Sequence, residues 1–150
     1  MDAQLLPDCQ RLQKALRQFA VLFSTRVNTL LGSGRINLPQ YHAMNILYEV
    51  RSMRMGELAR ALGVTMGAAT NLIDKLSGGG LVTRERDDQD RRVVNVALTP
   101  SGLRAVEGMR VRFAEFVSPV LAEIEPQERA QFLDTGEEII QLIEKNKTLT

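Results

Sequence analysis

The chain has 150 residues, of which 44% are hydrophobic and 25% charged, and its formal net charge is +1. These values lie near the average for globular proteins, so they exclude a disordered chain, and no apolar run approaches the roughly 20 residues that span a membrane. Cys9 is the single cysteine, and the first ten residues lack the basic and apolar regions of a secretion signal. We therefore expect a cytoplasmic protein with one hydrophobic core.

Charge is unevenly distributed along the chain. Residues 93–150 carry nine acidic and six basic side chains, whereas basic residues are in excess over residues 1–92. This asymmetry permits a nucleic-acid-binding face outside the C-terminal third.

The first half of the chain predicts helices. Apolar residues follow helical spacing over residues 7–31 and stop at the sequence GSGR. A second helix is expected over residues 37–50, with Pro39 suited to its first turn. Residues 51–54 interrupt the pattern.

Residues 55–80 contain two short helical stretches separated by Gly63. Ala59 and Ala69 are small enough to let the two helices cross closely, and the Thr65 hydroxyl can cap the second helix. The pattern indicates a helix-turn-helix. A helical hairpin that does not bind DNA would show the same spacing.

Two segments rich in β-branched residues follow, at 81–86 and 92–98, and predict a hairpin. Its tip lies within RERDDQDRR, residues 84–92, which holds four arginines and four acids. Such a run is compatible with a solvated turn, but its place after a helix-turn-helix favours a DNA-binding wing. Thr99 and Pro100 then suit the start of a helix over residues 101–124, and another is expected over 126–147. The fold class is therefore mainly α with a small β-hairpin.

The sequence gives little support for an enzyme. His42 is the single histidine and has no cysteine or carboxylate at metal-ligand spacing. The run SGGGLV follows a helix and enters a strand, which is the reverse of the order in phosphate-binding loops. We expect no catalytic activity, metal or cofactor.

A DNA-binding function accounts for more of the sequence. The start of a recognition helix contacts base edges in the major groove, and a wing arginine suits the narrow minor groove. Nearby carboxylates can orient such arginines, so Asp90 is expected to hold Arg91 or Arg92. Arg84 and Arg86 are expected to lie near phosphates or to be charges on the strand face. The candidate contacts on the recognition helix are Thr65, Gly67, Ala68, Thr70, Asn71 and Lys75.

These segments resemble the MarR family of bacterial transcriptional regulators. The likeness rests on LPQYHAMNIL, on VTMGAATNLIDKL and on GLVTRERDDQDRRVVNVALTPSG. It implies a homodimer with terminal dimerisation helices at 1–36 and 100–150 and a winged helix-turn-helix domain at 37–99. It also implies repression at a palindromic operator on double-stranded DNA, with release by a small aromatic or phenolic effector. Arg17, His42 and Met44 are candidates for the effector site.

One departure and two alternatives accompany this resemblance. Many relatives have arginine after the threonine of the recognition helix, whereas this chain has Thr70 followed by Asn71. Asparagine prefers adenine to guanine, so the operator is expected to differ. A redox-sensing regulator acting through Cys9 is one alternative function, and a winged-helix module that binds only proteins is the other.

Overall fold

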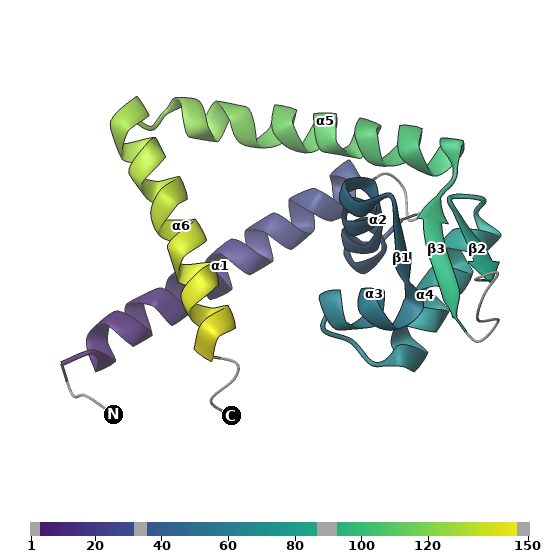
Figure 1. The fold of residues 1–150 in the computed structure, drawn as a ribbon. Coiled ribbons are helices and arrows are strands. Elements are labelled where there is room, and N and C mark those ends of the chain that lie inside the picture. Colours follow the sequence, from purple (N-terminus) through teal and green to yellow (C-terminus); the bar gives the residue numbers. More distant parts are fainter. Residues whose placement is uncertain (1–3, 32–35, 87–92, 147–150) are drawn as a thin grey trace. The chain divides into compact units, whose positions relative to one another are not determined.

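A computed structural model of the chain describes residues 4–31, 36–86 and 93–146. The chain divides into two compact units, residues 1–111 and 112–150. The first unit holds α1 (Leu6–Leu30), α2 (Leu38–Val50), β1 (Ser52–Arg54), α3 (Met55–Ala61), α4 (Met66–Gly78), β2 (Val82–Arg86) and β3 (Val94–Leu98), and α5 (Pro100–Ala122) begins there (Figure 1). The second unit holds the end of α5 and all of α6 (Pro126–Asn146).

Local capping explains where several helices begin. The Asn37 side chain accepts a hydrogen bond from the Gln40 N–H at 3.0 Å, and the Gln40 side chain accepts one from the Asn37 N–H at 2.9 Å. Pro39 lies in the first turn of α2, as predicted. The Thr99 hydroxyl accepts from the Gly102 N–H at 3.0 Å and so caps α5, which begins at Pro100 as expected.

The sheet has three strands in the order β1-β3-β2, all antiparallel. The hairpin of β2 and β3 was predicted, but β1 was not, because residues 51–54 were expected only to interrupt the helical pattern. Arg51 has a positive φ of 70° and turns the chain out of α2. The next three residues then pair along the edge of β3, with Met53 opposite Val96.

The core of the first unit joins helices and a strand of the winged helix-turn-helix to the start of α5. Its largest fully buried side chains come from α2, α3, α4, β3 and α5, and they are Met44, Leu47, Leu58, Ile73, Leu76, Val96 and Val106. These elements therefore share one apolar interior, which fixes α4 relative to the strands.

The first part of α5 is held on α2 by Arg110. Its guanidinium lies 4.9 Å from the centre of the Tyr48 ring and donates a hydrogen bond to the Asn45 side chain at 3.1 Å. Such a cation–π contact adds to the packing of Val106 and Met109 in the core.

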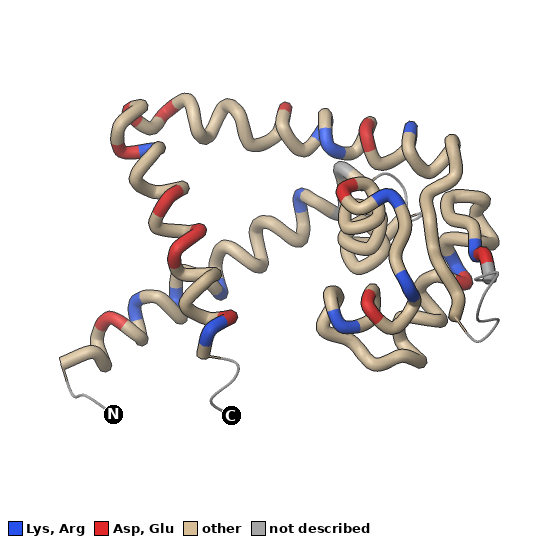
Figure 2. The backbone as a smooth tube through the Cα atoms, in the orientation of Figure 1, with Lys and Arg blue, Asp and Glu red and all other residues tan. Residues whose placement is uncertain are grey.

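The second unit has few buried contacts. Arg129 donates a hydrogen bond to the Leu121 carbonyl at 3.0 Å, which ties the start of α6 to the end of α5. The structure describes every residue of α6, and none of them is buried in the single chain. Acidic residues outnumber basic ones along this helix (Figure 2).

Candidate nucleic-acid interface

Helix α4 begins at a residue that the sequence identified. The Thr65 hydroxyl accepts a hydrogen bond from the Ala68 N–H at 3.3 Å, and Gly63 makes the preceding turn with a φ of 67°. Glycine tolerates this left-handed conformation because it lacks a Cβ. The cap and the turn together fix where α4 starts.

The sides of α4 have different surroundings. Ala69, Ile73 and Leu76 are buried and anchor the helix in the core. Met66, Thr70 and Asp74 follow one another at intervals of four residues, so they lie on one side of the helix. The predicted contacts at Gly67, Ala68, Asn71 and Lys75 are all exposed.

Thr70 differs from the other predicted contacts on α4. Its hydroxyl donates a hydrogen bond to the Met66 carbonyl at 2.8 Å, within the same helix. Its own carbonyl accepts a bond from Arg84 at 3.2 Å. Thr70 is half-buried and lies on the side of α4 that faces strand β2.

Arg84 connects the wing to α4. It lies within β2 and pairs in register with Val96. One guanidinium nitrogen, Nη2, lies 2.7 Å from Oδ1 of Asp74 and 3.2 Å from the Thr70 carbonyl. The predicted phosphate neighbour thus has two partners within the protein. The side chain of Arg86 and all of Asp90, Arg91 and Arg92 lie outside the described residues.

The base of the wing is closely packed against the start of α5. Gly80 has a φ of 69° and its carbonyl accepts a hydrogen bond from the Thr99 hydroxyl at 2.7 Å. The Thr99 N–H donates to the Leu81 carbonyl at 3.0 Å. A Cβ added to Gly102 would lie only 1.9 Å from that carbonyl oxygen. These contacts give a physical reason for the sequence LTPSG.

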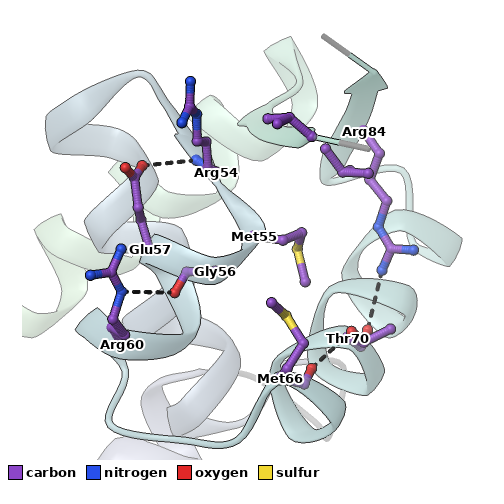
Figure 3. Close-up of a pocket in the computed structure, with 10 residues that line it drawn as sticks. Arg54, Met55, Gly56, Glu57, Arg60, Met66, Thr70 and Arg84 are labelled. Carbon is purple, nitrogen blue, oxygen red and sulfur yellow. Dashed lines mark hydrogen bonds between the residues drawn. The ribbon is translucent and has the colours of Figure 1, made fainter. Parts of the chain in front are cut away.

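Two hollows flank α4. The larger, of about 660 Å³, lies between α3, α4 and the wing, and Figure 3 shows the side chains around it. It is lined by Arg54, Met55, Gly56, Glu57, Arg60, Met66, Thr70, Arg84, Val93 and Val94. The smaller, of about 280 Å³, lies between α4 and the start of α2, and it is lined by Asn37, Pro39, Gln40, Ala68, Asn71, Leu72 and Lys75.

Comparison with known proteins supports the same architecture. The model of the MarR family matches residues 36–94. The HTH-type transcriptional regulator YsmB of Bacillus subtilis is 29% identical over 132 residues, which cover 88% of this chain and 90% of that protein. The chain belongs to the MarR family.

Solved structures share the MarR fold. The transcriptional regulator BldR from Sulfolobus solfataricus superposes with a TM-score of 0.76 at 25% identity, covering 94% of this chain and 99% of BldR. A DNA complex of MepR from S. aureus gives a TM-score of 0.74 at 23% identity, covering 87% of this chain and 96% of the MepR chain. This MarR protein is a DNA-binding transcriptional regulator, and its family is not enzymatic.

The candidate effector residues of this MarR protein lie in different surroundings. Met44 is completely buried in the core, whereas Arg17 is exposed on α1. His42 is exposed on α2 and lines a hollow of about 280 Å³ together with Asn45, Ile46, Glu49, Ala61 and Leu62. A ligand could reach Met44 only by displacing core side chains.

Other candidate chemistry is limited in the described part of this MarR protein. Cys9 is exposed near the start of α1. Residues 4–31, 36–86 and 93–146 contain no group of three potential metal ligands close enough to hold an ion. None of the helices in those ranges has the length and hydropathy needed to cross a bilayer.

The sequence did not predict a role for three polar residues on α4 or near it. Asp74 faces Arg84, and Arg54 and Arg60 line the larger hollow. Asp74 lies four residues after Thr70, which is a signal that it shares the same side of α4, but its partner on β2 is set by tertiary packing.

Proposed function

We propose that this regulator is a homodimeric repressor that binds a palindromic operator. Helix α4 of each copy enters the major groove, where a helix can contact base edges, and the wing follows the adjacent minor groove. The observation that carries the proposal is the exposed side of α4, which presents small residues, an amide and an ammonium group: Gly67, Ala68, Asn71 and Lys75.

Each residue on that side suits a distinct contact. Gly67 and Ala68 allow the helix backbone to approach the bases, and the Ala68 methyl can pack on a thymine methyl. The Asn71 amide matches the donor and acceptor of adenine, and Lys75 suits a phosphate. The Thr65 hydroxyl caps α4, so we assign Thr65 at most a contact with the DNA backbone.

Dimerisation is supported by apolar side chains that a single chain leaves exposed. On α1, Leu16, Phe19 and Leu22 are 58%, 61% and 70% exposed, and on α6 Phe132 and Ile140 are 65% and 58% exposed. Surfaces of this kind are typical of protein interfaces. A second copy would bury them and place two α4 helices about 34 Å apart, one turn of DNA.

Selection of bound genomic fragments followed by a gel-shift assay tests the proposed operator. The expected result is an inverted repeat with half-sites one helical turn apart. Asn71→Ala should relax the preference for adenine at one position of each half-site, at a cost of about 1–3 kcal/mol for the preferred base. An unchanged binding motif for Asn71→Ala would remove the assignment of Asn71.

The predicted wing contact has a separate test. Arg92→Ala should weaken binding to every sequence and lower the dependence of affinity on salt by about one phosphate equivalent. Unchanged affinity at moderate salt would contradict a role for Arg92 in binding.

Release by a small aromatic or phenolic effector completes the proposal. A cation and an imidazole, Arg17 and His42, are both exposed and available to an anionic ring substituent. Fluorescence titration with salicylate is a direct probe. Binding that Arg17→Ala or His42→Ala weakens, and that lowers operator affinity, would support these positions.

Oxidation of Cys9 is a second possible mode of release. The thiol is exposed, and the organic hydroperoxide resistance regulator of Bacillus subtilis is 32% identical over 73 residues, covering 49% of this chain and 50% of that protein. Peroxide should then release operator from the wild type and not from Cys9→Ser. Equal release from both would dismiss Cys9 as a sensor.

A further inference from the structure

The ion pair between Arg84 of β2 and Asp74 of α4 raises the question of why the proposed DNA-binding helix carries an acidic residue. Asp74 lies on the helix proposed to enter the major groove, and its side chain is 54% exposed. A carboxylate at such a place is repelled by DNA phosphates. Its closest described partner is Arg84, 2.7 Å away.

The ion pair between Arg84 and Asp74 is too exposed for its main role to be stabilising the fold. The side chains of Arg84 and Asp74 are 31% and 54% exposed, and ion pairs this accessible to water contribute little to folding stability. The helix is already anchored in the core by Ala69, Ile73 and Leu76. What the pair does determine is geometry, because Arg84 also donates to the Thr70 carbonyl one turn away.

The geometry joins two elements that must contact different grooves. Arg84 lies in the middle of β2, opposite Val96, and so precedes the tip of the wing. The larger hollow lies beside it, between α3, α4 and the wing (Figure 3). If α4 occupies the major groove and the wing the minor groove, the sugar–phosphate strand that separates the grooves passes between them. The distance between α4 and β2 therefore has to match the width of that sugar–phosphate strand.

We propose that Arg84 is a positioning residue, held by Asp74 and the Thr70 carbonyl, that sets the wing at the spacing required by the DNA backbone. This inference rests on the proposed DNA contacts of α4 and the wing. It assigns Asp74 a favourable part in DNA binding despite its charge. It also gives Arg84 an indirect part, in place of the phosphate contact that the sequence suggested.

The two possible roles of Arg84 predict opposite changes in operator affinity for Asp74→Asn. If Arg84 contacts phosphate directly, Asp74→Asn removes a repulsive charge and tightens binding, whereas Arg84→Gln weakens it. If Arg84 positions the wing, both substitutions weaken operator binding by about two- to tenfold, and the double variant is no weaker than the worse single variant. Glu107→Gln, which removes an exposed acid from α5, is the matched control and should leave affinity unchanged.

Hydroxyl-radical footprinting of the selected operator supplies a readout beyond affinity. We expect Asp74→Asn to lose protection in the minor groove flanking each half-site and to keep the major-groove contacts of α4, with a melting temperature close to that of the wild type. Wild-type protein that binds no operator would overturn the proposed function and this inference together. A wild type that binds, with an Asp74→Asn variant that binds equally well or more tightly, would overturn the positioning role alone.

Discussion

The winged helix-turn-helix and α6 differ in how completely one chain folds them. Six large side chains from four elements are fully buried in the first, and α2 and α4 begin at side-chain caps. Helix α6 buries none of its residues, although Phe132 and Ile140 are large and apolar. One region is thus stabilised within the chain, and the other has an apolar surface available to a second chain. The proposed binding of two copies to a palindrome requires both properties.

Substitution of one isoleucine in each region tests this difference most strongly. Ile73→Ala removes a completely buried side chain of α4 and should lower the free energy of unfolding by about 2–5 kcal/mol, because it leaves a cavity. Ile140→Ala, at a residue 58% exposed in one chain, should have little effect at protein concentrations low enough to dissociate a dimer. Urea denaturation at several concentrations measures both. Equal losses at low concentration would remove the distinction.

The joint between α5 and the wing provides a second test within one helix. A Cβ at Gly102 would lie 1.9 Å from the Leu81 carbonyl oxygen, whereas a Cβ at Gly108 meets nothing within 4 Å. Gly102→Ala should therefore destabilise the protein by about 1–3 kcal/mol through displaced backbone. Gly108→Ala should stabilise it by about 0.5–1 kcal/mol, because alanine favours helix. Thermal unfolding that ranks the variants in the opposite order would contradict the close packing.

A smaller effect is expected at the start of α4. Thr65→Ala removes the hydroxyl that accepts from the Ala68 N–H and should cost about 1 kcal/mol. Thr65→Ser keeps an acceptor and is the matched control. Chemical denaturation should place the serine variant near the wild type, and similar losses for both would argue against capping.

Local signals in the sequence predicted much of the winged helix-turn-helix. Thr65, Pro39 and Thr99 each act within one turn of a helix, so their positions could be predicted from neighbouring residues. Gly63 was likewise placed between the two helices, and with a φ of 67° it makes the turn there.

Contacts between distant segments could not be predicted in the same way. Strand β1 has three residues and forms because β3 offers it a free edge. Asp74 and Arg84 lie on separate elements whose approach depends on the core, and the need for glycine at position 102 arises from the carbonyl of Leu81. The predicted wing tip, Asp90 to Arg92, lies outside the described residues and stays a prediction.

The proposed division between a self-contained winged helix and shared terminal helices is tested most directly by sedimentation equilibrium. We expect the wild type to be a dimer. We expect Phe19→Glu combined with Ile140→Glu to be a monomer that retains the helical content of the winged helix. Its operator affinity should fall at least tenfold, because one of two half-site contacts is lost. A monomeric wild type, or a monomeric double variant that binds the full operator as tightly as the wild type, would contradict this division.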